Sequence, residues 1–386
     1  MGASEVNVIY DPAQPSFGAR SHDIFREMRD NAPVYADPEG RFFALSRFED
    51  VRSAALDWQT FSSKGKLEAQ YIKRTMSSLD PPEHAEIRAV ISRAFTPRRV
   101  AELENDIRAL AVGLIEQFIE SGECDAIADF STLLPSMVIG RLIGIPDELV
   151  PVCRELTDDN MRKTTPAGAG QPAARSYEIF ADLYDERRER PRDDLLSALL
   201  AAEINGRRLS EDELLAFGWL MLVGGNDTTT NLIGNGIELL ARHPQQRAEL
   251  AADRSLLPDA IEEMLRIESP THTLARHTAR EAVLPTGVIP AGTRVLLLWA
   301  SANLDEREFA DPETFDIHRR APRHLALGHG LHFCLGASLA RLEARVAFEE
   351  WLRRIPDYEV AHPPEHIVSS TFHGFEKLPI VFDPLA

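Results

Sequence analysis

The sequence predicts a mainly α-helical protein with small β-sheets, folded as one domain over all 386 residues. In many segments apolar residues recur at three- and four-residue steps, which is typical of helices, whereas alternating apolar patterns are short and few. One helical pattern, over residues 210–243, is about 51 Å long at 1.5 Å per residue and so crosses the whole molecule. A helix of that length favours one integrated domain over the two that chain length alone suggests.

Composition and charge exclude several classes of protein. Lys and Arg number 42 against 61 Asp and Glu, and the net charge of −19 disfavours nucleic acid and anionic membranes as partners. The three cysteines, Cys124, Cys153 and Cys334, are few and odd in number, as expected in a reducing compartment. The N-terminus has no apolar core or basic region, and the longest apolar run, residues 214–223, is too short to span a bilayer. We therefore expect a soluble, cytoplasmic protein.

The N-terminal part of the chain predicts short elements. After a flexible segment over about residues 1–20, a helix over 21–31 ends before Pro33, and residues 34–45 form a hairpin. Ser46 is expected to cap the next helix. Residues 62–78 are polar and aperiodic, which indicates a loop. Its basic side chains are solvated by default, with binding of a substrate carboxylate as the alternative. They are Lys64, Lys66, Lys73 and Arg74.

Helical patterns dominate the next part. A helix opens near Pro82, which suits a first turn, and His84 and Arg88 lie four apart on one of its faces. Further helical patterns cover residues 100–119, 131–143 and 147–162. The glycine-rich stretch 167–172 then breaks the series and predicts a flexible joint between two helices.

The long helix over 210–243 is expected to be buried, because its middle is apolar on every side. Ser210 and Glu213 form a capping box at its start. Residues 224–229 (Gly-Gly-Asn-Asp-Thr-Thr) are poor helix formers, so local distortion is expected there. A buried Asp is costly unless it is partnered or functional. Residues 226–228 could instead cap a second helix, although apolar periodicity on both sides disfavours that alternative.

The C-terminal third predicts one amphipathic helix followed by strands. Residues 259–266 are helical, and Glu263 and Arg266 can pair on one face at a spacing of three. Residues 288–295 predict a strand, a turn and a strand, and residues 358–384 predict small hairpins.

A lone cysteine, Cys334, lies where a glycine-rich loop enters a helix. Backbone N–H groups at a helix start favour negative charge, so we expect its thiol to ionise readily. Gly336 has no Cβ and lets a flat ligand lie against the first turn. A thiolate suits a soft metal, and haem iron is one candidate. Two alternatives are a buried packing cysteine and a zinc site. The zinc site would use His324, His329, His332 and Cys334.

Residues 327–341 resemble the haem-binding loop of cytochrome P450 monooxygenases, Phe-Gly-x-Gly-x-His-x-Cys-x-Gly followed by Leu-Ala-Arg. Only the leading aromatic differs, since Leu327 stands there. In the family this aromatic packs beside the thiolate and helps to set its electronics. The resemblance extends over about residues 79–384 through four motifs in the family's order. It implies the cytochrome P450 fold, haem b as cofactor and Cys334 as the axial ligand of the iron.

The other motifs imply further roles. His84, Arg88, Arg276 and His332 would hold the haem propionates, and Asp227 with Thr228 would supply protons for dioxygen cleavage. Glu263 and Arg266 would form a buried structural pair, locked by Arg319 or Arg320. Residues 158–178 would form the lid over the substrate channel. By position, the substrate pocket would be lined by Leu220, Val223, Gly224, Thr228, Thr271, Leu274 and Phe372.

The implied reaction inserts one atom of dioxygen into a C–H bond or alkene of an apolar small molecule. The chain has no Gly-x-Gly-x-x-Gly after a strand and no iron–sulfur cysteine set. Electrons are therefore expected from a separate ferredoxin with an NAD(P)H-dependent reductase. The ferredoxin would dock on a basic patch of Arg93, Arg98, Arg99, Arg341 and Arg345. A non-catalytic haem sensor or ligand sink is the alternative, which Asp227 and Thr228 speak against.

Overall fold

The structure, a computed structural model, describes residues 8–64, 75–92, 95–162, 166–204, 206–321 and 323–384. Its α-helices are α1 (Phe17–Asn31), α2 (Phe48–Leu56), α3 (Glu83–Ile91), α4 (Pro97–Glu102), α5 (Glu104–Ile115), α6 (Leu133–Ile143), α7 (Val150–Arg162), α8 (Pro166–Glu189), α9 (Leu195–Ala201), α10 (Glu211–Arg242), α11 (Pro244–Ala252), α12 (Leu257–Ile267), α13 (Trp299–Asn303) and α14 (Ala337–Arg354). Short 3-10 helices are η1 (Met76–Ser78), η2 (Ile119–Ser121), η4 (Asp147–Leu149), η5 (Arg254–Leu256) and η6 (Gly330–His332), and η3 (Ala126–Ser131) is a π-helix.

The strands form one five-stranded sheet and four smaller sheets among the described residues. The large sheet has the order β1 (Val34–Ala36), β2 (Phe43–Leu45), β10 (Arg294–Leu298), β7 (Thr273–Thr278) and β3 (Phe61–Ser62). A three-stranded sheet joins β11 (Glu359–Val360), β14 (Pro379–Val381) and β4 (Glu123–Asp125). Three pairs complete the set: β5 (Glu203–Ile204) with β6 (Arg207–Arg208), β8 (Ala282–Leu284) with β9 (Gly287–Ile289), and β12 (Glu365–His366) with β13 (Phe375–Lys377).

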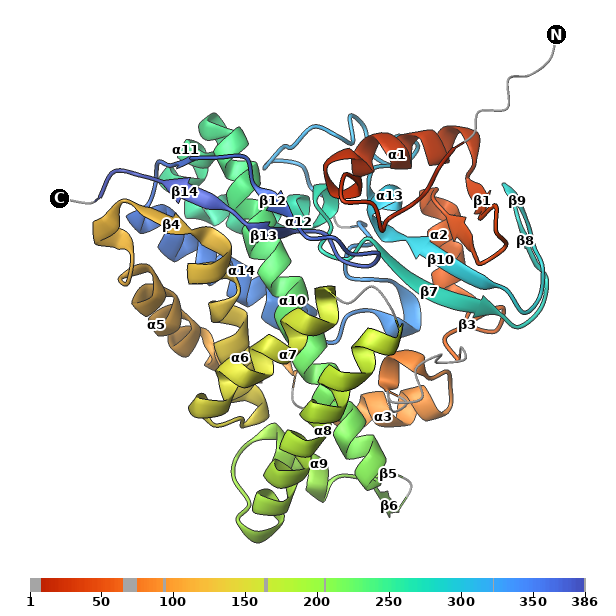
Figure 1. The fold of residues 1–386 in the computed structure, drawn as a ribbon, viewed down its shortest axis with the longest axis horizontal. Helices are drawn as coiled ribbons and strands as arrows, with labels where there is room; N and C mark the ends of the chain where they lie inside the picture. The colour runs from red at the N-terminus through yellow and green to blue at the C-terminus, as the bar shows by residue number, and fades with distance from the viewer. Residues whose placement is uncertain are drawn as a thin grey trace.

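Helices fill one side of the molecule and the five-stranded sheet lies on the other, beside α1, α2 and α13 (Figure 1). Helix α10 runs through the middle and contacts α6, α7, α8, α12 and α14. The prediction of a mainly helical protein with small sheets is confirmed.

Helix α10 contributes to both of the largest hydrophobic clusters. Leu232 and Ile237 pack in the cluster that includes α5, α12 and α14. Leu214 and Phe217, nearer its start, pack with α8 and α9. This sharing of one helix between two clusters supports the expectation of a single domain.

The start and the middle of α10 follow the sequence prediction. The Ser210 hydroxyl accepts a hydrogen bond from the Glu213 N–H, and the Glu213 carboxylate accepts one from the Ser210 N–H, so the capping box is present. The helix is unbroken at residues 226–228, so those residues do not cap a second helix.

Near the N-terminus the hairpin is confirmed and the cap is wrong. Strands β1 and β2 pair antiparallel, with Tyr35 opposite Ala44. Helix α2 begins at Phe48, and its first N–H donates to Asp305 from a distant loop (2.8 Å). Ser46 instead donates its hydroxyl to the Pro33 carbonyl. The tertiary carboxylate therefore replaces the local cap.

The predicted joint at residues 167–172 is also wrong, because α8 already begins at Pro166 and continues through these residues. Contacts of α8 with α7, α9 and α10 offset the low helix propensity of two glycines and Pro172. Much of the expected lid, residues 158–178, is therefore helical. The predicted strands over 288–295 exist but do not pair with each other, since β9 pairs with β8 and β10 joins the large sheet.

One described stretch, Ala126–Ile143, is long and apolar enough to cross a membrane. Most of it is buried inside the protein, where η3 and α6 pack against α5 and α10. Its apolar character is thus explained by the core.

Candidate active site

Cys334 lies between the loop that contains Gly328 and Gly330 and the start of α14 at Ala337. Its N–H donates to the Leu327 carbonyl (2.8 Å), which closes the loop on itself. Gly328 and Gly330 both have positive φ, at 72° and 70°, a conformation that favours glycine. A Cβ on Gly330 would also lie 2.8 Å from the Ala55 carbonyl of α2. The two glycines thus let the loop fold tightly against α2 and present Cys334.

The thiol of Cys334 does not ionise as readily as its position predicts. Burial raises its pKa, and this effect outweighs a hydrogen bond from the Gly336 N–H and the nearby charges of Arg88 and Arg341. The helix-start effect exists but is smaller than the desolvation. A bound metal ion deprotonates a coordinating thiol outright, so the raised pKa is compatible with ligation.

Four nitrogen-bearing side chains gather beside the cysteine loop: His84 and Arg88 from α3, Arg276 from β7, and His332 from η6. The rings of His84 and His332 lie 4.4 Å apart between centroids. Arg88 Nη2 donates to the Phe333 carbonyl (2.7 Å), next to the cysteine. The sequence-predicted propionate group is therefore brought together in space.

Positive charge outweighs negative charge in this cluster, because Asp80 is the one carboxylate that acts on Arg276, His332 and His84 among the described residues. Arg276 is 6% exposed, and within the described part of the chain its guanidinium donates to the Ala275 carbonyl alone. Burial lowers its pKa to about 10. Burial and the neighbouring Arg276 lower the pKa of His332 to about 3. Among the described residues, neither Arg88 nor Arg276 makes a salt bridge, and both ring nitrogens of the buried His84 lack a partner. An anionic ligand would satisfy these groups.

The zinc alternative fails on geometry. No three His, Cys, Asp or Glu side chains in the described part of the chain gather in a way that could hold a metal ion. His324 instead contacts the Glu262 carboxylate through Nε2 (3.0 Å).

Helix α10 carries an open face in its otherwise buried middle. Between Leu214 and Leu240, five of the residues that are not buried cluster over little more than two turns. They are Leu220, Val223, Gly224, Gly225 and Thr228. A Cβ on Gly225 would meet Ile139 of α6 at 2.7 Å, so this glycine serves helix packing. A Cβ on Gly224 would meet nothing within 4 Å, and the same holds for Gly336 beside Cys334. Both glycines therefore border open space.

The other predicted pocket residues are also incompletely buried. Leu274, the second residue of β7, is 44% exposed, although β7 lies between β10 and β3 in the large sheet. Thr271 and Phe372 are half-buried and form an isolated antiparallel bridge that joins the two segments.

Asp227 and Thr228 take different positions on α10. The Thr228 hydroxyl donates to the Gly224 carbonyl one turn earlier (3.0 Å), on the open face. Asp227 is fully buried, and its Oδ2 has no hydrogen-bond partner among the described residues. Burial and the nearby Asp158 hold its pKa well above the usual value, which favours the protonated carboxyl. The pair thus combines a carboxyl whose raised pKa favours protonation with a hydroxyl on the open face of α10.

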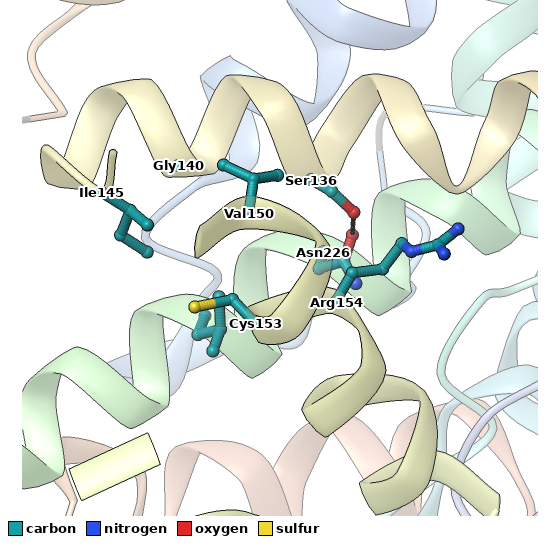
Figure 2. Close-up of a pocket in the computed structure, with 8 residues that line it drawn as sticks. Ser136, Gly140, Ile145, Val150, Cys153, Arg154 and Asn226 are labelled. Carbon is teal, nitrogen blue, oxygen red and sulfur yellow. Dashed lines mark hydrogen bonds between the residues drawn. The ribbon is translucent and has the colours of Figure 1, made fainter. Parts of the chain in front are cut away.

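A polar network that includes Asn226 anchors Asp227. Asn226 Nδ2 donates to Asp227 Oδ1 (3.1 Å) and to Thr157 Oγ1 of α7 (2.7 Å), and Asn226 Oδ1 accepts from Ser136 Oγ of α6 (2.6 Å). Figure 2 shows Asn226 and Ser136 bonded beside Arg154 and Cys153. The cavity at this place is about 10 Å³, which suits about one water molecule. Asp227 therefore has polar surroundings away from the open face.

The comparisons with known proteins agree with this geometry. The sequence model of the Cytochrome P450 family matches residues 174–373. Putative cytochrome P450 123 of Mycobacterium bovis is 38% identical, with 97% of this chain and 96% of that protein covered. Cyclomarin C epoxidase CymV of Salinispora arenicola is 38% identical, with 92% and 93% covered. The structure of cytochrome P450 CYP109Q5 from Chondromyces apiculatus has a TM-score of 0.91 and 35% identity, with 97% and 98% covered.

The chain belongs to the cytochrome P450 family. It is a P450 monooxygenase that uses dioxygen, and its cofactor is haem b. The residues present fit that group. Cys334 would ligate the iron, the open space at Gly336 and Gly224 would admit the flat ring, and the unpaired cluster with Arg276 would hold the propionates. Bound haem supplies redox chemistry with dioxygen, and thiolate donation favours O–O cleavage.

The P450 holds Glu263 and Arg266 in its core, both 0% exposed. Arg266 forks onto the Glu263 carboxylate through two hydrogen bonds of 2.7 and 2.8 Å. Arg319 contributes the third member, with Nε 3.0 Å from Glu263 Oε1. Arg320 is exposed instead and lies 4.0 Å from Asp259. Of the two arginines named from the sequence, Arg319 completes the group.

Most described arginines of the predicted docking patch are already paired. Arg341 forks onto Glu262, Arg345 contacts Glu104 and Glu349, and Arg98 contacts Glu102. Arg99 makes no salt bridge within the described part of the chain. Arg93 lies outside the described residues, as do Lys66, Lys73 and Arg74 of the basic loop. Lys64 is described and lies 3.5 Å from Glu83.

Sequence reasoning missed several supporting residues. Ser63 Oγ lies 2.9 Å from His332 Nε2, and Asp80 holds this serine through its backbone N–H (3.0 Å). Asp80 lies two residues before Pro82, at the predicted start of the helix of His84, so its position was an available signal. Thr157 and Ser136 carried no such signal, because they belong to other helices far from Asn226 in sequence.

Proposed function

We propose that this P450 inserts one oxygen atom into a C–H bond or an alkene of an apolar small organic molecule. Electrons come from a separate ferredoxin and its NAD(P)H-dependent reductase, and the enzyme works in the cytoplasm. The observation that carries the proposal is the open face of α10, which sets the Thr228 hydroxyl among apolar side chains. The protonated Asp227 is adjacent in sequence.

The chemistry of the lining supports an apolar substrate. Leu220, Val223, Leu274 and Phe372 offer hydrocarbon surface, and Thr228 and Thr271 add two hydroxyls. Apolar pockets with few polar groups bind small molecules chiefly by burial and use the polar groups for orientation. The Salinispora arenicola relative is an epoxidase by name, which supports alkene oxidation as one outcome.

The protein groups divide the work of proton supply. Asp227 keeps a proton because its carboxyl is buried near Asp158. Its Oδ2 is free to bond to water, whereas Oδ1 is anchored by Asn226. Thr228 can relay a proton to a molecule on the open face of α10, because a hydroxyl both donates and accepts hydrogen bonds. Mere ligand binding requires neither group, so this pair favours an enzyme over a haem sensor or ligand sink.

The sequence has no electron-relay motif, which supports a separate electron donor. Within the described part of the chain Arg99 makes no salt bridge, and Arg341 is partly exposed although it pairs with Glu262. A ferredoxin is acidic in the surfaces it offers to cationic partners, and Arg99 and the half-exposed Arg341 lie on elements near the cysteine loop. Complementary charge chiefly raises the rate of encounter. The remaining paired arginines contribute less, because their carboxylate partners cancel much of the field.

The test is substrate-dependent turnover with the haem-loaded enzyme, a ferredoxin and its reductase. Fatty acids, terpenoids, steroids and aromatic acids are first screened for shifts in the haem spin state. For a responding compound, ¹⁸O₂ should place one labelled atom in the product. Thr228→Val should divert reducing equivalents to peroxide. The matched Thr230→Val, whose buried hydroxyl has no partner, should not. Reductant consumption that is independent of every compound would support the sensor or sink instead.

A further inference from the structure

Three imidazole rings form a stack beside the bridge between Thr271 and Phe372. His272 and His373 lie 4.4 Å apart between ring centroids with an interplanar angle of 14°, and His366 lies 5.7 Å from His373 at 26°. We call these three residues the histidine stack. They come from two distant segments, the residues before β7 and the C-terminal β12–β13 region. His272 and His373 are buried, at 4% and 6% exposure.

One carboxylate serves this stack. Glu268, just after α12, places Oε2 3.0 Å from His373 Nε2 and 3.6 Å from His22 Nε2 of α1, and Oε1 3.2 Å from Arg242 of α10. Burial alone would raise the pKa of Glu268, but the charge and hydrogen bonds of His22 and His373 hold it well below its usual value. The carboxylate is thus ionised and ties three parts of the fold to one point.

The two buried rings of the stack are adjacent in sequence to two pocket residues. Thr271 precedes His272, Phe372 precedes His373, and Thr271 and Phe372 pair with each other. Neighbouring residues in an extended chain point to opposite sides. The half-buried pair, Thr271 with Phe372, therefore forms what we call the pocket wall, and the rings lie on its reverse side.

Backbone bonds fix the wall to the stack and to α10. The His272 N–H donates to the Thr371 carbonyl (2.7 Å), and the His373 N–H donates to the Pro270 carbonyl (3.0 Å). Asn235 of α10 donates to the carbonyl oxygens of Glu268 and His373 at 3.3 and 3.2 Å. A shift of either ring would therefore carry the wall with it.

We propose that the contact between Glu268 and His373 sets the position of the pocket wall, so that His373 is a positioning residue for substrate selection although it does not face the pocket. The proposal rests on the proposed function only in placing Thr271 and Phe372 at the substrate. Without the hydrogen bond between His373 and Glu268, the ring at position 373 can still stack on His272, but it is no longer held by the Glu268 carboxylate. The pocket wall of Thr271 and Phe372 then becomes more mobile and packs less closely against a bound molecule.

The test compares two probes that bind haem iron through the same nitrogen, imidazole and 4-phenylimidazole, in the haem-loaded enzyme. Only the phenyl group reaches beyond the iron toward the wall. His373→Phe keeps a flat ring for stacking. In this variant the dissociation constant of 4-phenylimidazole divided by that of imidazole should rise about 10-fold. In His373→Gln, which can still donate to Glu268, the ratio should return to within about 3-fold of the native value. His366→Phe is the matched control, because His366 is in the stack but, among the described residues, makes no hydrogen bond or ion pair with Glu268.

A second readout needs neither haem nor turnover. Hydrogen exchange at the His272 and His373 amides reports the two backbone bonds, and it should accelerate in His373→Phe and in Glu268→Gln but not in His366→Phe. A merely structural role would lower thermal stability without changing the probe ratio. An unchanged ratio in His373→Phe, or an equal change in His366→Phe, would overturn the proposal. Failure to bind haem through thiolate would overturn the proposed function instead and leave the exchange result intact.

Discussion

Replacement of Glu263 by Gln should cost about 3–5 kcal/mol of the free energy of unfolding. The carboxylate is 0% exposed and accepts two hydrogen bonds from Arg266, one from Arg319 and one from the Asp316 N–H (3.3 Å). Glutamine keeps the volume but leaves the buried guanidinium of Arg266 without a counter-charge. Arg266 would keep the carbonyl oxygens of Asn303 and Pro312 and could reach the Gln amide oxygen, but the second oxygen of the carboxylate becomes an NH2 donor that opposes the guanidinium.

The assay is urea unfolding of the haem-loaded protein, followed by tryptophan fluorescence and by loss of the haem absorbance. A loss of that size is a large share of the roughly 5–15 kcal/mol that domains possess, so the midpoint should fall far below the native one. The matched control is Arg320→Gln. Its side chain is 87% exposed and lies 4.0 Å from Asp259, so the change should stay within about 1 kcal/mol. A Glu263→Gln midpoint close to that control would refute the reasoning.

Three further predictions concern the site. Asp227→Asn should gain stability relative to the native protein as pH rises above about 4. The raised pKa of Asp227 means that its carboxyl binds more protons in the folded state than in the unfolded state, so the native protein loses stability as pH rises. Parallel curves of thermal stability against pH for the two proteins would contradict this. Arg276→Gln should stabilise the haem-free protein, since it removes a buried unpaired charge, yet release haem roughly 10–100-fold faster to an apo-globin acceptor, the value of one charged hydrogen bond; slower or equal release would count against a propionate contact. Arg99→Glu and Arg341→Glu should slow reduction by ferredoxin, more so at low salt, whereas Arg20→Glu on the distant α1 should not; equal rates for all three would remove these arginines from the docking surface.

Local sequence patterns identified the elements that local chemistry controls. The capping box of Ser210 and Glu213 and the hairpin of β1 and β2 depend on residues close in sequence, and both exist as expected. Predictions from local sequence fail where a group that is distant in sequence determines the local structure. Asp305 caps α2 in place of Ser46, and packing against α7 and α10 keeps residues 167–172 helical despite their glycines.

The site shows the same division. Spacing alone put His84 and Arg88 on one face of a helix, and the family motif placed them beside Cys334. The sign of the Cys334 pKa shift could not be read from its place at a helix start, because the opposing desolvation depends on the packed loop. Glu268 contacts His22 and His373, which lie in distant segments on either side of it in the sequence, so no periodicity could reveal these contacts.

The most direct measurement is the absorption spectrum of the ferrous carbonyl complex of the haem-loaded protein. With the native chain and with Cys153→Ser, which alters a buried cysteine on α7, the complex should show the red-shifted Soret band of thiolate ligation. Cys334→Ser should bind haem without that band. A red-shifted band that survives in Cys334→Ser, or is absent from the native protein, would contradict Cys334 as the ligand.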